Sequence, residues 1–144
     1  KMKVALKYKA EPIQYSTSYE LDVDVYAPCA LGGTVNPDTV PKMRCKIIAG
    51  SANNQIKDED TTIKLLQEHN ILYTPDFLIN SGALISCYSE LEGYGNERTE
   101  SLIRNIYSAT RHVLQKSREE NITTYDAAKQ LAEKRIIDIS KLRK

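Results

Sequence analysis

The sequence has 144 residues, of which 41% are hydrophobic, and a formal net charge of +1. Its length fits one domain with a packed core, and its charges are balanced and spread along the chain, which excludes nucleic acid as the expected partner. No apolar stretch approaches the roughly 18–20 residues that a membrane-spanning helix needs, and no secretory leader is recognisable, so we expect a cytoplasmic protein without a membrane partner.

Several segments in the first part of the chain predict secondary structure. Residues 1–10 carry apolar residues at helical spacing and predict a helix, and residues 12–14 read as a short strand. Residues 21–27 are rich in β-branched and aromatic side chains, so they predict a strand that the following proline ends. Asn36, which precedes a proline, predicts the cap of a short helix.

The middle of the chain continues this alternation. Connections of the observed length between alternating strands and helices predict a parallel sheet covered on both faces. The predicted elements are a strand over residues 45–49, a helix over 58–68, a strand at 72–73 and a helix over 77–91.

The pattern becomes entirely helical near the C-terminus. Helical periodicity extends from residue 96 to 118 and begins again at Thr124, which is a suitable cap. We therefore divide the chain into residues 1–92, which contain the sheet, and residues 93–144, a helical segment that packs back on the sheet or on a partner.

Cysteine and histidine usage argues against a disulfide framework and against a metal site. Cys29, Cys45 and Cys87 are odd in number and widely spaced, so we expect reduced thiols. His69 and His112 each lack carboxylates or cysteines at ligand spacing, and no metal ligands are predicted.

Small and polar residues follow each of the three predicted strands. These segments are residues 27–33 (Ala-Pro-Cys-Ala-Leu-Gly-Gly), residues 50–55 (Gly-Ser-Ala-Asn-Asn-Gln) and residues 75–82 (Pro-Asp-Phe-Leu-Ile-Asn-Ser-Gly). In open α/β sheets, ligands bind beyond the carboxyl ends of the strands. The sequence therefore predicts a ligand site built from three successive loops.

These three loops, in this order and at this spacing, resemble the amino-acid dehydrogenases of the Glu/Leu/Phe/Val type, and most closely those of the leucine dehydrogenase type. The resemblance extends from about residue 24 to 136 and includes Glu-Gly-Tyr at 92–94, Asn-Glu-Arg at 96–98 and Ile-Thr-Thr-Tyr at 122–125. It implies an α/β fold, namely the second half of a Rossmann-type parallel-sheet domain followed by C-terminal helices. It also implies NAD as cofactor and an L-amino acid as substrate.

Two features of the family have no counterpart in the sequence. The Gly-x-Gly-x-x-Gly loop that holds a dinucleotide pyrophosphate does not occur, so residues 1–92 are expected to form a nucleotide-binding domain without its first strand. The resemblance also implies a separate N-terminal domain with two catalytic lysines and an aspartate, and no segment matches those motifs. We therefore expect no catalytic residue in this chain, and expect the missing domain as its partner.

The resemblance assigns cofactor contacts to the first two loops. Cys29 and Ala30 match the family loop that lies against the cofactor's ribose and pyrophosphate, and Asn53 matches an asparagine that contacts the nicotinamide ribose. Small side chains also suit a tight exit from a strand, and an Asn-Asn pair also suits a turn. Both roles stay open at Cys29 and Ala30, whereas the surrounding motif favours the cofactor role for Asn53.

The third loop is assigned both cofactor and substrate contacts. Asn80 matches the asparagine that reaches the substrate's amino or carboxylate group, although a helix cap would use the same side chain. Leu84 and Cys87 match apolar residues that line the substrate pocket, and core packing is the alternative. The family usually reads Asn-Ala-Gly-Gly where this chain reads Asn-Ser-Gly-Ala at 80–83, which adds a Cβ near the cofactor.

Taken with the resemblance, these residues predict a portion of an NAD-dependent dehydrogenase that deaminates leucine or a near relative to the 2-oxo acid and ammonia. A phenylalanine- or valine-type specificity stays open. The alternative is a non-catalytic remnant that only folds and associates. Because a truncated sheet exposes an edge that attracts other chains, we also expect self-association into a homo-oligomer.

Overall fold

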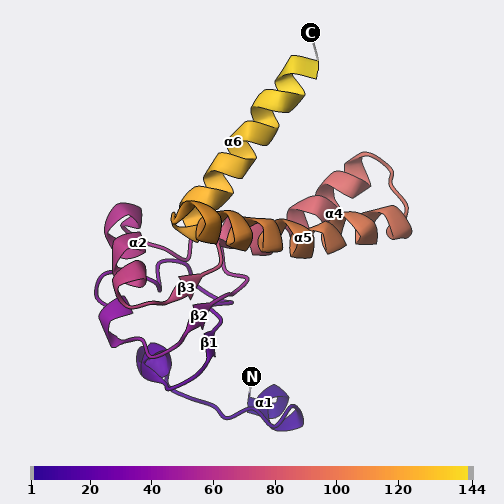
Figure 1. Cartoon of the computed structure of the whole chain (residues 1–144). Coiled ribbons are helices and arrows are strands. Elements are labelled where there is room, and N and C mark those ends of the chain that lie inside the picture. Colours follow the sequence, from indigo (N-terminus) through magenta and orange to yellow (C-terminus); the bar gives the residue numbers. More distant parts are fainter. Residues whose placement is uncertain (1, 143–144) are drawn as a thin grey trace.

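Three short parallel strands in the order β1-β2-β3 form the sheet of this α/β chain (Figure 1). Strand β1 (Val25–Tyr26) pairs with β2 (Ile47–Ile48), and β2 pairs with β3 (Leu72–Tyr73). The computed structural model describes residues 2–142, with all their side chains except those of Met2 and Tyr15. Because the strands are parallel, the loops that follow them emerge at the same edge of the sheet.

The strands occupy the predicted places; β1 and β2 are shorter than predicted, and β3 covers the predicted residues 72–73. Pro28 and Pro75 lie two residues beyond β1 and β3, and neither has an N–H group to donate to a ladder. Gly50 lies two residues beyond β2 and packs against the backbone of Pro28. Each strand therefore ends just before the loop that forms part of the carboxyl edge of the sheet.

The main hydrophobic core lies between the sheet and helix α2 (Glu59–Glu68). Complete burial of such a side chain contributes roughly 1.5–3 kcal/mol, so this cluster holds the helix on the sheet. Its buried members are Val35, Val40, Met43, Cys45, Ile48, Leu66, Ile71 and Tyr73.

Two N-terminal expectations need correction. Residues 12–14 form no strand and lead instead into the 3₁₀ helix η1 (Tyr15–Glu20). The predicted helix at Asn36 is a turn, in which Asn36 Oδ1 accepts the N–H groups of Asp38 and Thr39, followed by the 3₁₀ helix η2 (Val40–Lys42). An α-helix cannot continue there because Pro41 lacks the N–H group that would bond four residues back.

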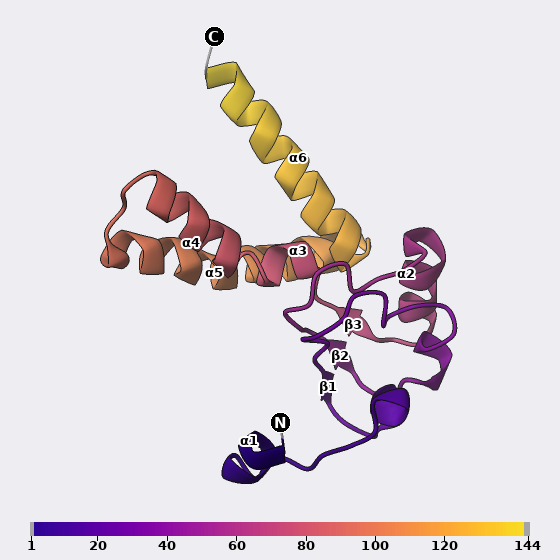
Figure 2. The ribbon, with the colours of Figure 1, turned by 180° about the vertical axis from the view of Figure 1, so that it is seen from behind.

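Helix α1 (Met2–Lys7) stands apart from the sheet in both views (Figures 1 and 2).

The helix predicted over 77–91 is two helices. Helix α3 (Asp76–Ile79) ends at Asn80, and α4 (Gly82–Leu91) begins after Ser81. The Ser81 hydroxyl donates to the Leu78 carbonyl at 2.7 Å, which closes the turn between them. This break turns the Asn80 side chain toward the loop that follows β2.

Two long helices complete the chain. Helix α5 (Asn96–Glu120) ends at Asn121, whose left-handed backbone (φ 52°) reverses the chain into α6 (Thr124–Leu142). Buried Val113, Ala127 and Ala128 join the two helices, and the second half of α6 extends away from the rest of the molecule (Figures 1 and 2). None of the helices in the described part is both long and apolar enough to cross a membrane.

Candidate functional site

The loops after β1 and β2 are in direct backbone contact at the carboxyl edge of the sheet. The Ala52 N–H donates to the Pro28 carbonyl at 2.9 Å. A Cβ added to Gly50 would lie only 2.2 Å from the same carbonyl oxygen, so only glycine permits this approach. The glycine of the Gly-Ser-Ala-Asn-Asn-Gln motif is thus needed for the contact between the two loops as well as for the turn.

Cys29 takes part in this contact through its sulfur. The Ser51 N–H donates to Cys29 Sγ at 3.5 Å. Hydrogen bonding to the Ser51 side chain, followed by that to its N–H, lowers the pKa of the Cys29 thiol. Cys29 and Ala30 are both exposed, and they line a groove of about 340 Å³ along β1. They therefore lie beside the groove that holds the predicted asparagines rather than within it.

The predicted asparagines of the second and third loops bond directly to each other. Asn80 Nδ2 donates to Asn53 Oδ1 at 2.6 Å and lies 3.5 Å from the Ala52 carbonyl oxygen. The Asn80 side chain thus bonds to another loop and caps no helix. Asn80 Oδ1 and Asn53 Nδ2 remain as one acceptor and one donor at the edge of the sheet.

A groove of about 840 Å³ runs from these asparagines along α4. It brings together four of the six predicted site residues, because Leu84 and Cys87 line it with Asn53 and Asn80. Leu84 is 73% exposed and Cys87 is also exposed, so neither is packed in the core. Ala83, which replaces the family's second glycine, also lines this groove.

Sequence reasoning missed several residues of the groove, among them Asp76, Phe77 and Tyr125. The Phe77 and Tyr125 rings meet edge to face with their centroids 5.7 Å apart. Burial, followed by the neighbouring Glu59 carboxylate, raises the pKa of Tyr125. Asp76 directly follows Pro75, a pattern that marks a helix start, but no local signal places Tyr125 in the groove.

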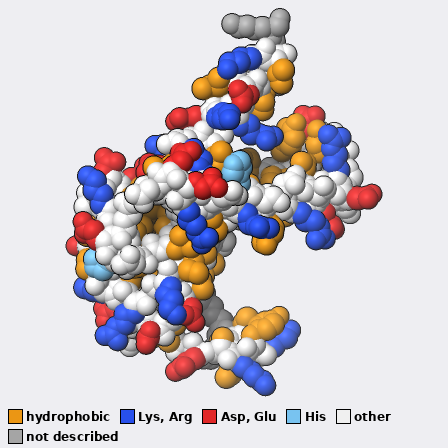
Figure 3. All heavy atoms as spheres, viewed as in Figure 1, with side chains coloured by type: hydrophobic (Ala, Val, Ile, Leu, Met, Phe, Trp, Pro, Cys, Tyr) orange, Lys and Arg blue, Asp and Glu red, His pale blue; other side chains and the backbone are white. Residues whose placement is uncertain are grey.

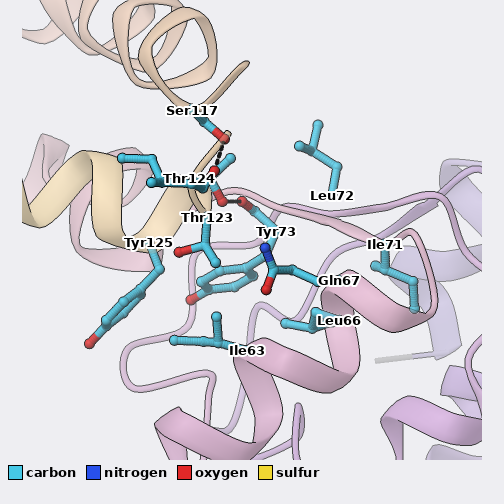
Figure 4. Close-up of a pocket in the computed structure, with 11 residues that line it drawn as sticks. Ile63, Leu66, Gln67, Ile71, Leu72, Tyr73, Ser117, Thr123, Thr124 and Tyr125 are labelled. Carbon is cyan, nitrogen blue, oxygen red and sulfur yellow. Dashed lines mark hydrogen bonds between the residues drawn. The ribbon is translucent and has the colours of Figure 1, made fainter. Parts of the chain in front are cut away.

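Tyr73 lines both the groove and a second, smaller cavity, whose lining residues are drawn in Figure 4. This cavity of about 140 Å³ lies between α2, β3 and the turn that joins α5 to α6, and none of the predicted site residues lines it. The Thr124 hydroxyl donates to the Tyr73 carbonyl, and burial raises the pKa of the Tyr73 phenol. The start of α6 is thereby fastened to the strand that precedes the third loop.

The charged and sulfur-bearing side chains do not assemble into a metal centre in the described residues. Within residues 2–142, no three His, Cys, Asp or Glu side chains are placed to hold a metal ion together. The groove instead combines amide, carboxylate and hydroxyl groups with an apolar wall, a combination that suits an organic ligand.

The parallel sheet and the helices that follow it define an α/β protein, with polar loops at the carboxyl edge of the sheet, where ligands bind in open α/β sheets. The chain belongs to the Glutamate/Leucine/Phenylalanine/Valine dehydrogenase family, whose model matches residues 2–143. This match confirms the resemblance stated from the three loops.

Similarity to individual amino-acid dehydrogenases supports the same family assignment. An L-tryptophan dehydrogenase from Nostoc punctiforme is 43% identical over 90% of this chain, and a leucine dehydrogenase from Bacillus cereus is 42% identical over 95% of it. The crystal structure of the Nostoc punctiforme L-tryptophan dehydrogenase superposes with a TM-score of 0.92 over 97% of this chain. The chain spans 36% and 37% of the lengths of the two curated relatives, and 42% of the crystallised chain.

Proposed function

We propose that this chain is a portion of an NAD-dependent L-amino-acid dehydrogenase, with the groove at the carboxyl edge of the sheet as part of its active site. The observation that carries the proposal is the Asn53–Asn80 hydrogen bond, which joins two loops at the edge where ligands bind in such folds. Membership of the family and relatives named for leucine and tryptophan support an amino acid as substrate.

The amide groups of the second loop fit the nicotinamide half of NAD. Asn53 is exposed and its Nδ2 has no partner in the described residues, so it is available to donate to a ribose hydroxyl. Cys29 and Ala30 lie on the neighbouring loop and would contact the remainder of the cofactor. When bound, the nicotinamide supplies the acceptor for a hydride from the substrate Cα, and the protein orients the two.

The third loop and α4 fit an amino acid. Asn80 Oδ1 is an acceptor for the substrate's α-amino group, and its position is fixed by the hydrogen bond that Nδ2 makes to Asn53. Leu84 and Cys87 would form an apolar wall against the substrate side chain, which suits a branched aliphatic group. We therefore place leucine or a near relative first among the substrates.

The test is an assay of the complete protein that contains this chain, with leucine, phenylalanine, tryptophan and valine as substrates. We expect NADH formation that depends on the amino acid, with leucine giving the highest kcat/KM. The 144-residue chain alone should form no NADH, because the proposed catalytic lysines and aspartate lie outside it. A complete protein that binds neither NAD nor any amino acid would support the non-catalytic alternative.

Self-association is part of the same proposal. Strand β1 lies at the edge of the sheet, where Leu21, Val23 and Val25 are exposed, and an open apolar edge pairs with other chains. We expect concentration-dependent association by light scattering, which Val25→Lys should reduce. Val4→Lys, which changes an exposed valine of α1 instead, is the control.

A further inference from the structure

Gln55 is a fully buried side chain inside the second loop, and nothing in its sequence position identifies it as more than a turn residue. Its Nε2 donates to the carbonyl of Gly50 at 2.7 Å and to the carbonyl of Ala52 at 2.9 Å. The side chain thus closes the loop from within. Asn53 follows directly after one of the two carbonyls that it holds.

Asp76 connects this loop to the third one. Its Oδ2 accepts the N–H of Gln55 at 3.0 Å, and its Oδ1 accepts the N–H of Phe77 at 2.8 Å. Its backbone carbonyl accepts the N–H of Asn80 at 2.9 Å. A single residue therefore holds the end of the loop that carries Asn53 and the start of the helical turn that carries Asn80.

The chemistry of this position explains why a carboxylate occupies it. Asp76 is 9% exposed and has no ion-pair partner within residues 2–142, and burial of an unpaired charge is costly. Asparagine would avoid that cost, but it has one acceptor oxygen and would turn an NH₂ group toward one of the two N–H donors. The carboxylate accepts from both loops at once.

We propose that Asp76 and Gln55 are positioning residues that set the separation of the Asn53 and Asn80 carboxamides, and hence the placement of the substrate's Cα against the cofactor. The catalytic part of this inference rests on the proposed function. The structural part does not, since the hydrogen bonds exist in the chain itself. Neither side chain needs to touch a ligand for this role.

The first experiment measures amide hydrogen exchange by NMR on the isotopically labelled chain. Asp76→Asn should accelerate exchange at the Gln55 or the Phe77 amide by about 10- to 100-fold, because one of these N–H groups loses its acceptor. The Thr74 amide, which donates to the Ile48 carbonyl within the sheet, should keep its protection. Asp38→Asn, at an exposed acid, is the matched control and should change none of these rates.

A second variant keeps the inference testable if Asp76→Asn does not fold. Gln55→Met has nearly the same shape and removes only the two donors to Gly50 and Ala52. It should accelerate exchange at the Ala52 amide by about 10-fold while Thr74 stays protected. Gln130→Glu, at an exposed glutamine of α6, is its control.

The second experiment is a double-mutant cycle in the complete protein. Asp76→Asn should lower kcat for the amino acid by about 10- to 100-fold with a smaller change in the KM for NAD. In the double variant, kcat for the amino acid should be only slightly lower than in Asn80→Ala alone, because Asp76 acts on the substrate through the position of Asn80.

The outcomes separate the two proposals. Unchanged exchange at both the Gln55 and Phe77 amides in folded Asp76→Asn overturns the positioning role, and so do additive losses of kcat in the cycle. A complete parental protein without any dehydrogenase activity overturns the proposed function instead. In that case the exchange rates still decide whether Asp76 and Gln55 hold the two loops together.

Discussion

The carboxyl edge of the sheet and the second half of α6 hold their residues in place by opposite means. At the edge, short strands and loops are fixed by contacts between segments far apart in the chain, such as the Gly50–Pro28 approach and the Asn53–Asn80 hydrogen bond. In the second half of α6, the backbone satisfies its own hydrogen bonds, and Ile136 and Leu142 are 69% and 86% exposed. Figure 3 shows this part of α6 standing clear of the molecule with apolar side chains on its surface.

The difference has a physical consequence for substitutions. A change at the edge is transmitted to two or three loops, because each group there depends on a partner in another segment. A change at the exposed end of a helix stays local. The following predictions test this contrast, beginning with the largest expected effect.

Asn80→Ala in the complete protein should lower kcat/KM for the amino acid by about 100-fold, since loss of one positioned polar contact has effects of this size. The Asn80 carboxamide would no longer place the substrate Cα, while NAD binding should weaken much less. Asn53→Ala should instead raise mainly the KM for NAD. Steady-state kinetics with each substrate varied measures both, and near-parental kcat/KM in a folded Asn80→Ala variant would refute the substrate role.

Gly50→Ala should destabilise the chain by about 1–3 kcal/mol, as is usual for overpacking. The new Cβ would lie 2.2 Å from the Pro28 carbonyl oxygen, so one of the two loops must move. Gly95→Ala is the matched control, because a Cβ there meets no atom within 4 Å. Urea unfolding followed by circular dichroism gives both free energies, and equal stability of the two variants would contradict the interlocked edge.

The two halves of α6 should respond differently to the same kind of change. Ala128→Gln places a longer polar side chain against α5 and should cost about 1–3 kcal/mol, whereas Ile136→Gln should change the free energy of unfolding by less than about 0.5 kcal/mol. Thermal unfolding of both variants under one buffer condition makes the comparison. A large loss from Ile136→Gln would mean that the second half of α6 is packed in solution.

The smallest effect concerns thiol reactivity. Hydrogen bonding to the Ser51 side chain and to its N–H lowers the pKa of exposed Cys29, so its thiolate forms at lower pH than in an ordinary cysteine, whereas burial raises the pKa of Cys45. Iodoacetamide should therefore alkylate Cys29 at least about 10-fold faster than Cys45, with the rate at Cys29 rising from a lower pH. Mass spectrometry of quenched samples gives the rates. Ser51→Pro, which removes both the hydroxyl and the N–H donor, should shift the rise at Cys29 to higher pH.

Much of the fold follows from local patterns in the sequence. The helices over 59–68, 96–120 and from 124 onward lie close to the predicted segments, because apolar periodicity and caps are local properties. The division at Asn80 was not predicted, since the residues on both sides favour a helix. At the break, the Asn80 side chain bonds to Asn53, 27 positions away. Local patterns cannot report such a partner.

The sequence also predicted part of the lining of the candidate groove, although the roles of these residues stay predictions. Asn53, Asn80, Leu84 and Cys87 come from short motifs and are found together in one groove. Asp76, Gln55 and Tyr125 were missed because their roles depend on what they meet in three dimensions. Gln55 lies in a segment whose sequence reads as a turn, but its side chain is as buried as that of a core residue. Only this burial shows that Gln55 closes the loop from within.

The hydrogen bond between Asn53 and Asn80 also sets the thermodynamics of ligand binding at this edge. The two N–H groups of Asn80 Nδ2 already have the Asn53 and Ala52 oxygens as partners, so a ligand that accepts a hydrogen bond from Asn80 Nδ2 must replace one of them, whereas Asn53 Oδ1 keeps one lone pair. Such an exchange yields little net enthalpy. Affinity here must therefore come from the groups that are still unused, namely Asn80 Oδ1, Asn53 Nδ2 and the second lone pair of Asn53 Oδ1, and from displaced water. The protein has met the entropic cost of aligning both amides before any ligand arrives.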